Sequence, residues 1–90
     1  MLEGSVKVTN RLGLHARAAA QLVRLAGTFR SRITLRRTDA EVFANAKSIL
    51  SVLALGAPMG TGLVIEAEGA DEQEAFDSVM ALFANGFGEI

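Results

Sequence analysis

The only histidine of the chain, His15, stands where its chemistry is useful, directly before an apolar segment that reads as a helix. A helix start normally takes Ser, Thr, Asp or Asn as its cap, so histidine is a weak structural choice there. The first amides of a helix have no intrahelical partner and attract anions. We therefore expect the amides of Ala16, Arg17 and Ala18 to face an incoming anion.

Arg17 adds a guanidinium, a group suited to phosphate oxygens, two residues after the imidazole. The positive end of the helix disfavours the imidazolium and so favours a neutral, nucleophilic ring. Together these groups predict phosphoryl transfer through His15, with Arg17 stabilising the phosphoryl charge. On spacing alone, a loop histidine beside a solvated arginine remains the alternative.

The elements that must position His15 follow from apolar periodicity and from cap and turn residues. We predict a helix over 16–26, a short helix through Leu53 that Ser48 caps, and a last helix that Asp71 and Glu74 open as a capping box and Asn85 and Gly86 end. Strands are expected over 4–9, 29–37, 41–46 and 63–68. This order, βαββαβα, predicts an α+β open-faced two-layer sandwich in one domain, residues 1–90.

Composition excludes several classes of site and partner. The 90 residues contain no cysteine and one histidine, which rules out disulfides, thiolate metal sites and multi-histidine metal sites. A net charge of −1 argues against a general nucleic-acid binder. No signal peptide and no membrane span are recognisable, so we expect a cytoplasmic protein without metal or cofactor.

Three separated blocks, together spanning nearly the whole chain, resemble one known family. They are Asn10 to Arg17, Asn45 to Leu50 with the Leu53, Leu55 and Gly56 that follow, and Glu68 to Ala75. Their residues and order are similar to those of HPr, the histidine-containing phosphocarrier of the bacterial phosphoenolpyruvate-dependent phosphotransferase system. Two departures are Ala18, where many members have proline, and a hairpin at 38–41 that is about two residues longer.

The resemblance implies a four-stranded antiparallel sheet in the order 1-4-2-3, with three helices on one face. It implies that His15 takes phosphate on Nδ1 from phosphorylated enzyme I and passes it to enzyme IIA domains, for sugar uptake or regulation. The chain would then be a phosphoryl carrier, expected as a monomer, rather than a stand-alone catalyst of small-molecule turnover. Phosphocarriers outside sugar uptake, including those of a nitrogen-linked branch, carry the same Asn10 to Gly13 start.

The resemblance also suggests a regulatory site and a docking surface. Ser48 is either an ordinary helix cap or, in addition, a site phosphorylated by HPr kinase/phosphorylase. By position in the family, the first helix contributes Ala16, Arg17, Ala20 and Arg24 to partner binding. The second helix contributes Lys47, Ile49, Leu50 and Leu53.

Two readings from other classes remain. A nucleic-acid-binding module would rest on Arg30, Arg32, Arg36 and Arg37, although a solvated basic strand explains these arginines more simply. A purely regulatory relative would bind partners without transferring phosphate, and the presence of His15 argues against it. The tail from Gly86 to Ile90 carries no recognisable pattern.

Overall fold

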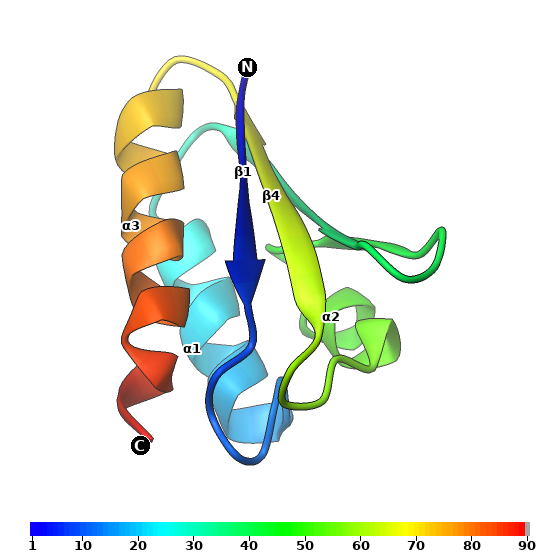
Figure 1. Cartoon of the computed structure of the whole chain (residues 1–90). Coiled ribbons are helices and arrows are strands. Elements are labelled where there is room, and N and C mark those ends of the chain that lie inside the picture. The colour runs from blue at the N-terminus through cyan, green and yellow to red at the C-terminus, as the bar shows by residue number, and fades with distance from the viewer. Residues whose placement is uncertain (90) are drawn as a thin grey trace.

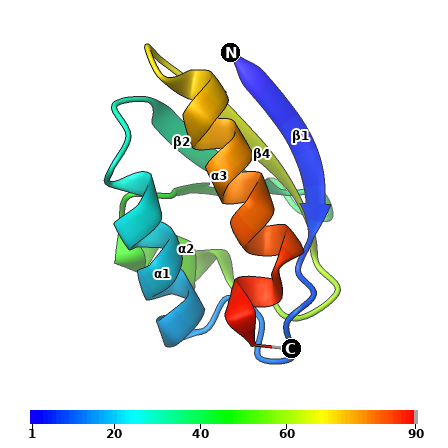
Figure 2. The same ribbon diagram turned by 90° about the vertical axis from the view of Figure 1, so that its left-hand side faces the viewer.

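The computed structural model describes residues 1–89 and forms an open-faced sandwich of one sheet and one helical layer (Figures 1 and 2). The elements in chain order are β1 (Leu2–Lys7), α1 (Ala16–Ala26), β2 (Arg32–Arg37), β3 (Phe43–Asn45), α2 (Ile49–Leu55), β4 (Gly62–Glu68) and α3 (Glu72–Ala84), followed by a 3₁₀ turn at Gly86–Gly88. The predicted element order is therefore confirmed.

The sheet is antiparallel throughout and has the order β1-β4-β2-β3. Inward side chains alternate along its strands, as a half-buried sheet requires. The core forms between this face and the helices, and its largest side chains without solvent contact include Ile33 and Leu35 of β2, Leu63 and Ile65 of β4, and Leu22 of α1. The predicted architecture and strand order are thus both confirmed.

The second strand begins at Arg32, three residues later than the predicted Phe29. The cause is the carboxylate of Asp71, which accepts bonds from the amides of Arg30 and Ser31 at 2.9 Å each and from the hydroxyl of Ser31 at 2.6 Å. These interactions lower the pKa of Asp71 to about 2, with the Ser31 hydroxyl as the largest cause. The amides of residues 30 and 31 therefore bond to a side chain and not to a neighbouring strand.

The same contacts overturn the predicted capping box at α3. Asp71 makes no side-chain cap bond, because its carboxylate is turned toward the connection between α1 and β2. Glu72 instead reaches back and accepts from the amide of Gly69 at 3.2 Å. The helix still begins where predicted, but Asp71 ties two distant segments together and does not cap the helix.

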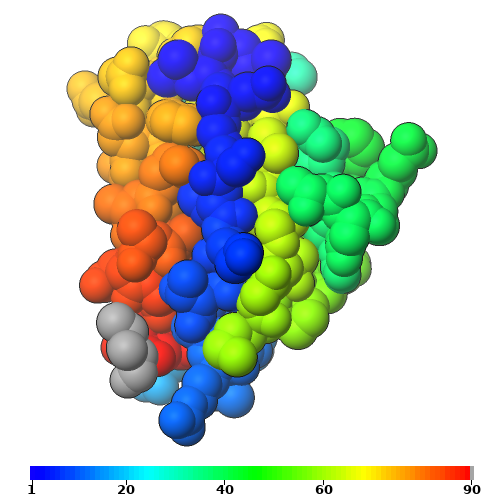
Figure 3. Space-filling model, in the orientation of Figure 1, coloured from blue at the N-terminus to red at the C-terminus, as the bar shows by residue number. Residues whose placement is uncertain are grey.

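The hairpin between β2 and β3 projects on one side of the molecule (Figure 3). Arg37 anchors its base, donating to Asp39 at 2.7 and 2.8 Å and to the carbonyls of Leu55 and Gly56 at the end of α2. Arg32 lies opposite Glu68 in the sheet register. These partners disfavour a free basic face for nucleic acid. No helix within residues 1–89 has the length and apolar character needed to cross a bilayer.

Candidate functional site

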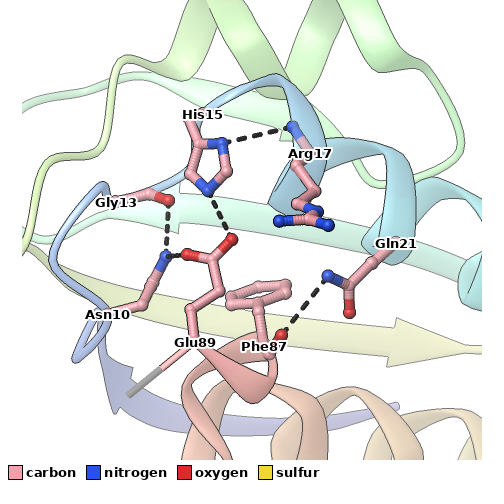
Figure 4. A network of polar contacts seen from close by, with 7 residues as sticks. All are labelled: Asn10, Gly13, His15, Arg17, Gln21, Phe87 and Glu89. Carbon is pink, nitrogen blue, oxygen red and sulfur yellow. Dashed lines mark hydrogen bonds and ion pairs between the residues drawn. The ribbon is translucent and has the colours of Figure 1, made fainter.

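His15 is the N-cap of α1, as the sequence predicts (Figure 4). Its backbone is extended, with φ −76° and ψ 179°, and Nδ1 of its ring accepts a hydrogen bond from the amide of Arg17 at 3.3 Å. An imidazole nitrogen thus occupies the place of the usual serine or aspartate oxygen. The ring keeps a quarter of its surface exposed, so an incoming group can reach it.

The loop before His15 is held on both sides. Gly13 has a φ of +64° and lies against the backbone of Ala57 and Pro58, so closely that only glycine fits. The amide of Leu14 donates to the carbonyl of Ala57 at 2.9 Å, and Asn10 donates from its side chain to the carbonyl of Gly13 at 2.7 Å. These contacts fix the entry of the chain into α1 and therefore the direction of the His15 ring.

Glu89, 74 residues further along the chain, approaches the other side of the ring. Its carboxylate lies 2.7 Å from Nε2 of His15 and accepts from the side-chain amide of Asn10 at 2.9 Å (Figure 4). The Asn10 amide first, and then the His15 ring, stabilise the carboxylate charge and lower the pKa of Glu89.

These two contacts select one tautomer of the imidazole. The amide of Arg17 can only donate, so Nδ1 accepts, and the ionised carboxylate of Glu89 can only accept, so Nε2 carries the proton. A neutral ring with its proton on Nε2 satisfies both neighbours. Nδ1 then holds the free electron pair that a nucleophile needs. The sequence predicts only positive surroundings for the ring, from the start of the helix and from Arg17, whereas the structure adds the negative carboxylate of Glu89.

A shallow hollow next to the Glu89 carboxylate is lined by Arg11, Leu12, Arg17, Gly88 and Glu89. Two guanidinium groups, from the loop and from the first turn of α1, thus line this hollow together with the carboxylate that contacts Nε2 of His15. Such groups suit a phosphoryl anion through charge-assisted hydrogen bonds. Within residues 1–89, no three His, Asp or Glu side chains gather closely enough to hold a metal ion.

The predicted phosphate-binding amides differ in accessibility. Ala16 and Arg17 are exposed, whereas Ala18 has no accessible surface. The regular helical bonding begins with the amide of Ala19, which donates to the carbonyl of His15 at 2.8 Å. An anion arriving from solvent therefore meets the first two residues of the helix, and the buried third contributes to the core.

Ser48 caps α2, since its hydroxyl accepts from the amide of Ser51 at 3.3 Å. The cap reading of this serine is confirmed, and its regulatory phosphorylation stays a prediction. The ammonium of Lys47 donates to the carbonyl of Phe29 at 2.7 Å, and its role in partner binding stays a prediction. That bond ties the start of α2 to the end of the α1–β2 connection.

The other residues predicted to bind partners lie on two helices that pack side by side (Figure 2). On α1, Arg24 is exposed and Ala20 is half-buried. On α2, Leu50 keeps 77% of its surface, and Ile49 and Leu53 keep 38% and 39%. Leu12 and Met59 are exposed as well. Leu12, Ile49, Leu50, Leu53 and Met59 are called the apolar patch below.

Asn10 and Glu89 are the two site residues that sequence reasoning missed. Asn10 stands inside the first motif block, where its side chain is 1% exposed and touches the site through Gly13 and Glu89. A polar residue at the start of a glycine-containing loop was a usable signal. Glu89 follows Gly-Phe-Gly in a tail without periodicity, and nothing local indicates where its side chain goes.

Comparisons with known proteins agree on one family. A family model described as the PTS HPr component phosphorylation site matches residues 2–85. The phosphocarrier protein HPr of Cupriavidus necator is 47% identical over 89 residues, covering 99% of this chain and 98% of that protein. The phosphocarrier protein NPr of Proteus mirabilis is 46% identical over 84 residues, covering 93% and 92%.

The fold leads to the same family. A crystal structure of HPr-C-His from Thermoanaerobacter tengcongensis superimposes with a TM-score of 0.92 at 38% identity, covering 100% of this chain and 99% of that chain. The sheet order, the capping histidine and the matches over the full length thus lead to one assignment: this chain belongs to the HPr family of phosphocarrier proteins.

Proposed function

We propose that the chain accepts a phosphoryl group on Nδ1 of His15 from phosphorylated enzyme I and delivers it to enzyme IIA domains. The observation that carries this proposal is the pair of contacts that the ring makes, with the Arg17 amide at Nδ1 and the Glu89 carboxylate at Nε2. Nδ1 presents an electron pair at the N-terminus of α1, within 3.3 Å of the Arg17 amide. A nucleophile and a preorganised anion site therefore coincide.

The charge of the transferring group is balanced by residues already in place. Arg11, in the loop before His15, and Arg17, in the first turn of α1, line one hollow, and the positive end of the α1 dipole lies at His15. Phosphoryl transfer needs positioning and charge stabilisation more than further covalent chemistry from the protein. An accessible imidazole at a helix N-terminus satisfies that requirement.

Docking of the two partners is assigned to the apolar patch and to Arg17 and Arg24. Exposed apolar side chains bordered by arginine are typical of transient protein interfaces. The loop before His15 is adjacent to the loop after α2, because the amide of Leu14 donates to the carbonyl of Ala57. A partner seated there reaches Nδ1 without entering the core.

Incubation with phosphoenolpyruvate and enzyme I tests the proposal. The wild-type chain should gain one acid-labile, base-stable phosphate, as expected for phosphohistidine, and His15→Ala should gain none. The circular dichroism and thermal unfolding of His15→Ala show whether α1 survives the loss of its cap. Labelling of a folded His15→Ala at the wild-type rate would contradict the assignment of the nucleophile.

A second candidate is service in the nitrogen-linked branch, which is favoured by the 46% identity to a protein named NPr. The same His15 chemistry would operate with a different donor and acceptor. Parallel labelling with the sugar-branch enzyme I and with its nitrogen-branch counterpart separates the two. The physiological donor should phosphorylate the chain at least tenfold faster, since specificity is a difference between affinities.

A further inference from the structure

The tail that carries Glu89 has an unusual backbone. Gly86, Phe87 and Gly88 have φ values of 60°, 57° and 74°, so three consecutive residues are left-handed. Phe87 is the only non-glycine residue with a positive φ within residues 1–89. That conformation is strained for a side chain with a Cβ, and it persists only where surrounding contacts hold it.

Two contacts hold Phe87 in this conformation. Its ring is 3% exposed and packs edge-on against Phe83, with the ring centroids 5.0 Å apart. Its carbonyl accepts from the side-chain amide of Gln21 on α1 at 3.3 Å. The left-handed turn therefore reverses the chain after α3 and directs the next side chain, Glu89, toward the start of α1 (Figure 4).

Two contacts hold the Glu89 carboxylate near the start of α1. One carboxylate oxygen accepts from Asn10 and the other faces Nε2 of His15, and the side chain keeps only 17% of its surface. Asn10 is itself anchored to the carbonyl of Gly13. The carboxylate, the loop and the ring thus form one network, in which the place of Glu89 fixes the orientation of the imidazole.

We propose that Glu89 is the positioning residue of His15: it keeps a proton on Nε2 throughout the transfer cycle, so that Nδ1 alone acts as the nucleophile. This inference rests on the phosphocarrier function proposed above and deepens it. A carboxylate that orients a reactive imidazole through its second nitrogen is a general device for fixing both the tautomer and the ring direction.

The transfer step balances without moving this proton. The electron pair of Nδ1 attacks phosphorus, and the bond from phosphorus to the donor atom breaks, with its electron pair staying on the donor. The ring then carries both an N–P bond and an N–H, and hence a positive charge that the adjacent Glu89 carboxylate offsets. On delivery, the N–P electron pair returns to Nδ1 and restores the neutral ring.

The charged side chains around the ring support this role. The amide of Arg17 faces Nδ1, where the phosphoryl group would be attached, and the Glu89 carboxylate faces Nε2, the other nitrogen of the ring. Arg11 and Arg17 line one hollow together with Glu89. A hydrogen-bond donor therefore stands by the phosphoryl group, and a negative group stands by the ring that becomes positive. Loss of the Glu89 side chain removes the carboxylate contact at Nε2, and a proton on Nδ1 would block the attack.

Glu89→Ala tests the proposal, with Glu74→Ala as the control. Glu74 is an exposed carboxylate on α3, so its removal makes the same change in net charge away from the site. Two measurements are made on each protein: the Nε2 proton resonance of His15 in ¹⁵N-labelled protein at low temperature, and the initial rate of phosphate uptake from phosphorylated enzyme I. Thermal unfolding verifies that both variants are folded.

We expect Glu89→Ala to lose the protected Nε2 proton signal and to take up phosphate about tenfold more slowly, since misorientation of a reacting group commonly costs one to two orders of magnitude. Glu74→Ala should match the wild type in both. An unchanged uptake rate in Glu89→Ala overturns the proposal, and so does a slow rate with the Nε2 signal retained. Failure of the wild-type chain to take up any phosphate would instead refute the proposed function.

Discussion

Gly13 is the tightest point between the His15 loop and the loop that follows α2. A Cβ at this position would lie 2.5 Å from the carbonyl oxygen of Ala57 and 2.8 Å from Cα of Pro58, both backbone atoms. Gly56 provides a matched control, because its φ of +63° equals the +64° of Gly13 within a degree, and its nearest neighbours are 3.9 Å away. The effects of an alanine substitution at the two sites should therefore differ mainly through the steric contacts of the added Cβ.

The two substitutions should therefore differ in stability by a calculable amount. Each places alanine in the left-handed region, which costs about 1 kcal/mol. Gly13→Ala must in addition separate the two loops and break the bond from the Leu14 amide to the Ala57 carbonyl. Both of those residues are at least 95% buried, so the unpaired groups add about 1–3 kcal/mol. The totals are about 1 kcal/mol for Gly56→Ala and about 2–4 kcal/mol for Gly13→Ala.

Thermal and urea unfolding measure this difference. For a chain of this size, 1 kcal/mol corresponds to a shift of about 4–8 °C in Tm, so Gly13→Ala should melt at least about 5 °C below Gly56→Ala. Phosphate uptake by Gly13→Ala, measured below its Tm, should also fall, because the loop directs the His15 ring. Equal Tm values for the two variants would refute the view that the contact with Ala57 and Pro58 holds this loop.

Two further predictions concern acid stability and docking. Asp71 has a native pKa of about 2, below its ordinary 3.8, so it stabilises the fold above pH 4 and this contribution is lost as the pH falls toward 2. Asp71→Asn should therefore lower the Tm at pH 7 and flatten the decline of the Tm between pH 4 and 2. Thermal unfolding at several pH values measures this effect, with Asp77→Asn as the control. Leu50→Asp should weaken enzyme I binding about tenfold in calorimetric titration, because the substitution buries a charge in the interface. Ala81→Asp, an exposed position on α3, should leave the affinity unchanged. Equal affinity of the two variants would contradict the placement of the docking surface at Leu50.

Local signals located the elements that position His15. The boundaries of α1 follow from an apolar period of 3.6 and from the motif around the histidine, and the observed helix, Ala16–Ala26, has the predicted limits. The α2 helix begins after Ser48 as predicted, because a serine cap is a local feature. Caps and apolar periodicity involve residues only a few positions apart, so the sequence alone predicts them.

The sequence does not reveal where a side chain bonds far from its own position. Asp71 has the spacing of a capping box, yet its carboxylate accepts from residues 40 and 41 positions earlier, where β2 was expected to have begun. Lys47, which is predicted to bind partners, also bonds to the carbonyl of Phe29, 18 positions away. Glu89 reaches His15 only because α3 and α1 lie side by side and the strained turn reverses the chain. No local pattern encodes these pairings.

The capping role of His15 bears directly on its proposed chemistry. The electron pair that caps α1 is the same one that would attack phosphorus, so phosphorylation removes the acceptor of the Arg17 amide. Histidine is not among the preferred N-cap residues, and a serine or aspartate at this position would stabilise the start of the helix by about 1 kcal/mol more. The helix start tolerates this weaker cap, because Ala16, Ala18, Ala19 and Ala20 are the strongest helix formers. Once phosphate is attached, its oxygens lie two bonds from Nδ1 and are the acceptors available to the same amide, so we expect the helix to begin at the same residue in both states. On the proposed function, the N-cap of α1 would change from an imidazole nitrogen to a phosphoryl oxygen and back, which would explain why a histidine stands where serine or aspartate is structurally preferred.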